Sequence, residues 1–249
     1  SSFRDCKKLT EISIPSTITE IGDNFFANCS SLKEVSISSS ITTIGNNSFS
    51  GCKSLKHIII PPSVKTIGQS TFSGCSLLHE ILLPTTITTL NDSTFFKCAS
   101  LSKIKIPTSV HLIGNSTFSG CKTLSEIEIP SSIITIGNSA FAQCISLTKL
   151  TIPSSVQSIG DFVFSGCSSL SEVTIECSIK SPKWNQFCTN LSKIMHVHHE
   201  SLSIGSSAFH GCSSLKEINI PTSVTSIGSN AFRDCTAKEV FLIALHWQK

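Results

Sequence analysis

The sequence is poor in charge. Only 14% of its 249 residues are Asp, Glu, Lys or Arg, and the net charge is +3. Its 19 lysines and arginines are spread along the chain rather than gathered in one stripe. Nucleic-acid binding usually needs a concentrated basic surface, so we interpret these residues as solvated surface and predict no nucleic-acid partner.

Long apolar runs are also lacking. The longest, such as residues 240–245 (VFLIAL), fall far short of the ~20 residues that cross a membrane. No basic segment followed by an apolar one opens the chain, so we expect neither a membrane span nor a signal peptide in it. The 39% of hydrophobic residues is nevertheless enough for a sizeable core.

Sequence motifs of catalysis are missing as well. The chain has no G-x-S-x-G elbow, no glycine-rich phosphate loop after a strand and no H-E-x-x-H. We therefore predict that the protein is not an enzyme and holds no cofactor.

The 12 cysteines include no C-x-x-C pair, although zinc sites usually need ligands at such short spacing. Eight of them fall 23 residues apart without exception: Cys6, Cys29, Cys52, Cys75, Cys98, Cys121, Cys144 and Cys167. This spacing indicates one cysteine per structural unit. Stacked Cβ atoms that point the same way make poor disulfide geometry, so we expect free thiols.

The same period governs most of the sequence. Residues 52–74 (CKSLKHIIIPPSVKTIGQSTFSG) and 121–143 (CKTLSEIEIPSSIITIGNSAFAQ) share one template, and a phenylalanine recurs three residues before each cysteine of the series. Self-similarity at this length is typical of a solenoid, in which each coil buries its apolar face against its neighbours.

Each template position predicts a structural role. In residues 52–74, Leu55, Ile58 and Ile60 alternate with polar residues and predict a half-buried strand. Val64 and Ile67 supply inward residues on the opposite side of the coil, and we expect Gly68 to permit a corner with positive φ. A hydroxyl ladder after the strand is expected to satisfy backbone groups: Thr17, Ser40, Ser63, Thr86, Ser109, Ser132, Ser155, Ser178 and Ser223.

The pattern L-x-x-I-x-I-P-x-S-V-x-x-I-G-x-x-A-F-x-x-C resembles the BspA-type leucine-rich repeat over essentially the whole chain. The resemblance implies a mainly β solenoid of about ten to eleven coils with a concave parallel sheet and short strands or turns on the convex side. We expect one solenoid over 1–249, with regular coils in 1–167, irregular coils in 168–211 and a regular coil plus a strand or cap in 212–249.

The resemblance also implies a surface-displayed or secreted protein with a binding and adhesion role, whose members often lack an enzymatic domain. A protein partner is the leading expectation, and a glycan is the weaker one. The alternative is an intracellular scaffold, in which free thiols would escape oxidation.

Outward positions of the strands supply the candidate binding residues. From Glu80 onward the position before the first strand isoleucine alternates in sign from coil to coil, which favours a solvated charge ladder over a catalytic pair. Ile59 and Leu82 are apolar on neighbouring coils and suggest a binding patch. The partner-binding candidates are His57, Ile59, His79, Leu82, Lys103, Lys105, Glu126, Glu128 and His196.

The stretch KIMHVHHE, residues 193–200, gathers three of the eight histidines. His196 and His198, with Cys188 upstream, are candidate metal ligands, although consecutive strand residues point to opposite sides. The interpretation we favour is a register correction inside the one irregular interval, the 45 residues from Cys167 to Cys212. In that register His196 lies on the concave face.

The end of the chain, CTAKEVFLIALHWQK, predicts a last strand with Val240 and Leu242 inward. Phe241, Ile243 and Trp247 then form an apolar edge that either folds back as a cap or joins two copies end to end.

Overall fold

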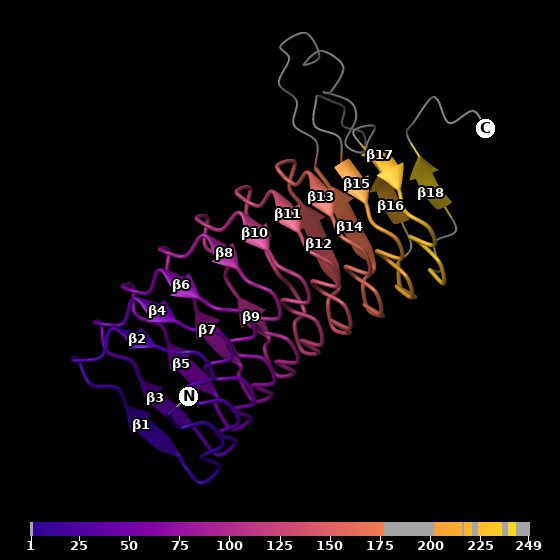
Figure 1. Ribbon diagram of the computed structural model, residues 1–249. Coiled ribbons are helices and arrows are strands. Elements are labelled where there is room, and N and C mark those ends of the chain that lie inside the picture. The colour runs from indigo at the N-terminus through magenta and orange to yellow at the C-terminus, as the bar shows by residue number, and fades with distance from the viewer. Residues whose placement is uncertain (1, 177–201, 216, 221–223, 236–238, 243–249) are drawn as a thin grey trace.

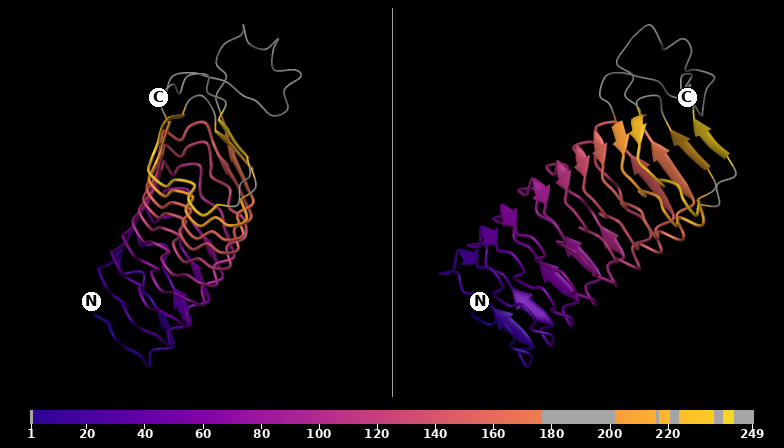
Figure 2. Two further views of the ribbon diagram at one scale, coloured as in Figure 1. Left: turned by 90° about the vertical axis from the view of Figure 1, so that its right-hand side faces the viewer. Right: turned by 45° about the vertical axis from the view of Figure 1, so that its right-hand side comes forward.

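The computed structural model describes residues 2–176, 202–215, 217–220, 224–235 and 239–242. Figure 1 shows a stack of similar coils, and Figure 2 shows that the stack bends only gently along its length. Most coils contribute one strand to a front sheet and one to a back sheet. No helix occurs within the described ranges, and hence none that is long and apolar enough to cross a membrane.

Two rows of strands define the solenoid. The front sheet, which is hydrogen-bonded in three sections, consists of β1 (Glu11–Ser13), β3 (Glu34–Ser36), β5 (His57–Ile59), β7 (Glu80–Leu82), β9 (Lys103–Ile104), β12 (Lys149–Ile152), β14 (Glu172–Ile175), β16 (Glu217–Ile220) and β18 (Glu239–Leu242). Residues 126–128 occupy the same repeat position but form no strand. The back sheet consists of β2 (Glu20–Ile21), β4 (Thr43–Ile44), β6 (Thr66–Ile67), β8 (Thr89–Leu90), β10 (Leu112–Ile113), β11 (Thr135–Ile136), β13 (Ser158–Ile159), β15 (Leu202–Ile204) and β17 (Val224–Ile227). Every strand pairing is parallel, which confirms a mainly β solenoid.

The predicted inward positions are buried. Leu55, Ile58, Ile60, Val64 and Ile67 are all at most 4% exposed, so both sheets face one continuous core. Phenylalanines from successive coils stack along this core at ring-centroid distances of 5.1–5.7 Å from Phe26 to Phe209. The ring column is the largest apolar component of the interior.

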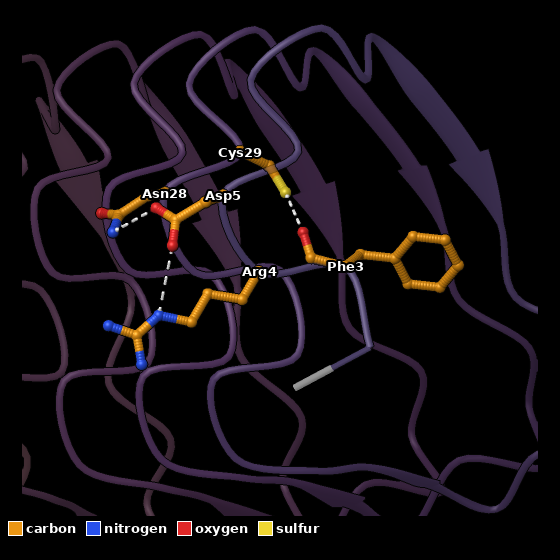
Figure 3. Close-up of polar contacts among 5 residues, drawn as sticks. All are labelled: Phe3, Arg4, Asp5, Asn28 and Cys29. Atoms are coloured by element: carbon orange, nitrogen blue, oxygen red, sulfur yellow. Dashed lines mark hydrogen bonds and ion pairs between the residues drawn. The ribbon is translucent and has the colours of Figure 1, made fainter.

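The cysteines that recur once per coil form a column in the core, and their thiols donate hydrogen bonds although their surroundings are apolar. Figure 3 shows the Cys29 thiol donating to the carbonyl oxygen of Phe3 over 3.0 Å. Each later thiol of the column donates to the corresponding phenylalanine carbonyl of the preceding coil at 3.1–3.3 Å. The ten described cysteines are free thiols, as expected. Each of these carbonyls also accepts the backbone N–H of the cysteine in its own coil, so the thiol supplies a second donor from the next coil. Cysteine therefore combines an apolar body with a weak donor that links neighbouring coils.

The hydroxyl ladder is confirmed from Ser40 to Ser155, whereas Thr17, in the first coil, makes no such bond within the described residues. Ser109 Oγ donates to the Ile87 carbonyl over 2.7 Å, and the same bond links Ser40, Ser63, Thr86, Ser132 and Ser155 to the carbonyls of Ile18, Ile41, Val64, Val110 and Ile133. Ser178 and Ser223 lie outside the described residues. These bonds tie each turn to the coil before it.

The prediction for Gly68 is wrong. The positive φ falls two residues later, at Ser70 (φ 53°), and the corresponding residue repeats this in neighbouring coils. Glycine is needed at position 68 because a Cβ there would lie 2.6 Å from the backbone nitrogen of Asn46 in the preceding coil. Close approach of stacked backbones, rather than backbone conformation, explains this column of glycines.

The interval between Cys167 and Cys212 also differs from the expectation. β13 pairs directly with β15 and β14 with β16, so no further coil lies between them. Phe164 and Phe209 stack at 5.1 Å across the same junction. Residues 168–176 and 202–211 are thus parts of one coil, and residues 177–201 lie outside the described chain. The predicted ten to eleven coils is a slight overestimate: the solenoid has about eight turns, because the prediction divided this interval in two and counted partial end coils.

Candidate functional site

The outward face of the front sheet is built by strict alternation. In β5 and β7 the central residue is buried and its two neighbours are exposed. Successive strand residues point to opposite sides, so every coil places two side chains on this face at fixed positions. Parallel pairing in register then lines these positions up along the solenoid.

An apolar patch lies near the N-terminal end of this face. Ile59 is 77% exposed and Leu82 is 69% exposed, the two largest values among the exposed large hydrophobic residues described. They are register partners on β5 and β7. His57 and His79 lie next to them, with ring centroids 6.3 Å apart in an edge-on arrangement. The structure therefore brings four predicted binding residues together.

A charged region follows on the next two coils. Lys103 and Lys105 are exposed on one coil, and Glu126 and Glu128 are exposed on the next. None of the four makes an ion pair within 4.0 Å with any other described residue. The one ion pair found on this face in the described part of the chain joins Lys149 Nζ to Glu172 Oε2, its register partner, over 3.2 Å. Such exposed pairs contribute ~0–1 kcal/mol to stability, so this pair adds little to the stability of the fold.

The charged region lies in a groove of about 940 Å³. Its lining includes the predicted binding residues Leu82, Lys103, Lys105, Glu126 and Glu128, and also Glu80, which was not among them. It also includes Ser131, Lys149, Thr151 and Glu176, which the sequence interpretation did not select. Lys149 occupies the same repeat position as Lys103, and this shared position was the available signal.

Most of the candidate metal ligands and candidate association-edge residues cannot be placed in the structure. His196, His198 and Cys188 lie outside the described residues, as do Ile243 and Trp247. Phe241 lies in β18 opposite Asn219, and Val240 and Leu242 are register partners of Ile218 and Ile220.

No cluster able to hold a metal ion is found elsewhere. Within the described ranges, no group of three or more His, Cys, Asp or Glu side chains could hold such an ion. Cysteine burial also limits reactivity, since desolvation raises the pKa of the Cys52 thiol to about 12. The exposed face is therefore the feature with functional potential.

Solved structures similar to this chain are repeat proteins. A leucine-rich repeat protein of T. pallidum is 28% identical, with a TM-score of 0.59 over 84% of this chain and 78% of that one. The pneumococcal vaccine antigen PcpA is 20% identical, with a TM-score of 0.56 over 88% of this chain and 58% of that one. A leucine-rich cell surface protein of Faecalibacterium prausnitzii is 28% identical, with a TM-score of 0.47 over 93% and 78%. A search of curated proteins finds no match.

The family comparison agrees with the geometry. The model of the BspA type leucine rich repeat region matches residues 1–125, 88–201 and 112–239, in six copies. These matches cover nearly the entire chain and include all the described strands up to the start of β18. The chain belongs to the BspA-type leucine-rich repeat family.

Proposed function

We propose that this protein is a non-enzymatic binding scaffold that recognises a protein partner through the outward face of its front sheet. The observation that carries the proposal is the exposure of Ile59 and Leu82 on adjacent strands beside the charged groove. An apolar centre with a polar surround is the usual anatomy of a protein interface. A glycan would be expected to need a richer set of convergent hydrogen-bonding groups, so protein is the better fit.

Family membership supports display at the cell surface or secretion, with adhesion as the biological use. One observation favours a second location: the ten described cysteines are free, which suits a reducing intracellular compartment. A membrane-impermeant amine label applied to intact cells of the source organism separates the two. Labelling before lysis supports surface display, and labelling only after lysis supports the intracellular scaffold.

The binding role is tested with a pair of matched variants. Ile59→Asp combined with Leu82→Asp places charge at the centre of the face, and Ile134→Asp makes the same change on the back sheet side, where Ile134 is 42% exposed. Wild-type protein is used as bait against extracts and membranes of the source organism. Both variants should keep the wild-type melting temperature, because the altered side chains project into solvent.

We expect the front variant to recover about thirtyfold less of any partner than wild type, the loss typical of a central interface residue. The back variant should recover the same amount as wild type. Equal recovery by all three proteins would mean that binding does not use this face, and the proposal would then be wrong.

A further inference from the structure

The charges of the front sheet are arranged so that the face complements itself. We propose that two copies of this chain associate front sheet to front sheet with their coil stacks antiparallel. The inference rests on the proposed function, that this face binds protein, and names the partner as a second copy of the chain.

The central charges have the signs that such pairing requires. Lys103 and Lys105 give their coil two positive charges, and Glu126 and Glu128 give the next coil two negative ones. Among the described residues none of these four side chains has an ion-pair partner within 4.0 Å, so no described residue competes with a second molecule for them. All four line the groove.

A two-fold axis parallel to the strands, passing between these two coils, superposes opposite charges. This rotation places each residue opposite a residue at the same strand position of the second copy, and the coils of the second copy run in the reverse order. The same patch then contacts itself, as an isologous interface requires. Lys103 then faces Glu126 of the second copy, and Lys105 faces its Glu128. Each contact occurs twice by symmetry.

The complementarity continues outward on both sides. One coil further from the axis, Glu80 faces Lys149 of the second copy, and the next pair is His57 and Glu172. The apolar residue Leu82 faces Thr151, and Ile59 faces Thr174, whose methyl groups suit them. One coil beyond these, both copies carry glutamate at the ladder position, so the match covers six coils.

The alternative with parallel stacks is unfavourable. A two-fold axis along the solenoid places each coil against the same coil of the second copy and exchanges the two outward positions. Lys103 would then face Lys105, and Glu126 would face Glu128. Juxtaposed like charges destabilise an interface, so the charge pattern selects the antiparallel arrangement.

Size and shape indicate a weak, salt-sensitive dimer. Six coils spaced about 4.8 Å apart span about 29 Å, and this places the contact below the ~1,200 Å² typical of stable complexes. The groove hollows this face, and lysine and glutamate are long enough to reach across a hollow where serine could not. Charge attraction, rather than apolar burial, then provides most of the affinity.

Charge-swapped variants test the proposal. Lys103→Glu with Lys105→Glu makes both central coils negative, and Glu126→Lys with Glu128→Lys makes both positive. Sedimentation equilibrium of the wild type should show a dimer at about 50 mM NaCl that weakens at least about tenfold at about 500 mM NaCl. Each double variant alone should be monomeric, an equimolar mixture of the two should form a heterodimer, and the variant carrying all four changes should dimerise as wild type does.

Rescue in the mixture also shows that both double variants are folded. A wild type that stays monomeric at every concentration and salt would overturn the dimer. So would a dimer that persists in both double variants, because the contact would then use another surface, such as the C-terminal coil. The proposed function is tested separately, by the recovery of a foreign partner with wild-type protein and with the Ile59 and Leu82 variant. A failure of the dimer proposal does not change the result of that experiment.

Discussion

Raising the pH above about 9 should unfold this protein over a narrow range, because its core contains a column of protonated thiols. Desolvation by burial raises the pKa of Cys52 and Cys167 to about 12. The same cause raises the pKa of the four cysteines between them, Cys75, Cys98, Cys121 and Cys144, well above its ordinary value. These six thiols are completely buried, and each donates a hydrogen bond to a phenylalanine carbonyl.

The direction of the effect follows from proton linkage. A thiol in the unfolded chain loses its proton near pH 8.5. In the folded protein Cys52 and Cys167 keep their protons until about pH 12, and burial raises the pKa of the four thiols between them well above its ordinary value. The stability from protonated thiols is therefore fully present below about pH 8.5 and is lost as the pH rises towards the folded pKa.

The expected magnitude is large because the six thiols act together. Between the two pKa values each thiol lowers the free energy of unfolding by about 1.4 kcal/mol per pH unit, so six lower it by about 8 kcal/mol per pH unit. Total stabilities are typically ~5–15 kcal/mol, so unfolding should be complete within about two pH units above pH 9.

Urea denaturation followed by circular dichroism at a series of alkaline pH values measures this slope. Thiolate absorbance can be recorded in parallel without interference from tyrosinate, because the chain contains no tyrosine. Cys98→Ser keeps a donor for the Phe72 carbonyl but removes one titrating group, so the slope should fall by about 1.4 kcal/mol per pH unit. Cys6→Ser, at an exposed position, is the control and should leave the slope unchanged. A stability that is flat from about pH 8 to pH 11, or thiolate absorbance that appears before unfolding, would refute the reasoning.

Two further predictions test the contacts between coils. Gly68→Ala should lower the free energy of unfolding by ~1–3 kcal/mol through the clash with the preceding backbone, whereas Gly22→Ala, with nothing within 4 Å, should change it by less than ~0.5 kcal/mol. Equal effects of the two substitutions in urea denaturation would contradict the steric explanation. Ser109→Ala should cost ~1 kcal/mol because it leaves the Ile87 carbonyl without its donor, and Ser131→Ala, at an exposed position nearby, should be nearly neutral. Indistinguishable melting temperatures for these two serine variants would mean that the ladder contributes nothing.

The regular part of the fold could be predicted because one template is copied from coil to coil. Alternation places Leu55, Ile58 and Ile60 inward, and the structure buries all three. A hydroxyl repeated at one phase has to meet the same backbone group each time, and this argument correctly anticipated the bond made by Ser109. Repetition converts a weak local signal into a strong one.

What the sequence could not supply are distances between coils. The steric reason for Gly68 depends on how closely Asn46 approaches in the preceding coil, and no local pattern reveals that distance. A 45-residue interval is likewise compatible with two irregular coils or with one coil whose strands pair on either side of an insertion. The pairing of β13 with β15 and of β14 with β16 distinguishes the two.

For the candidate site, the sequence predicts which side chains are exposed but not which charged side chains form ion pairs. Exposure of Ile59 and Leu82 follows from alternation alone, but the significance of the charges depends on which of them pair within the chain. Lys149 and Glu172 meet at 3.2 Å, yet Lys103 and Glu126 have no such contact although they occupy the same ladder positions. Two neighbouring coils of this repeating surface thus carry charged side chains that form no ion pair with another described residue. These charges are positive on one coil and negative on the next, so the face suits a partner whose charges alternate in the opposite order. A second copy of the chain in antiparallel orientation presents such a surface.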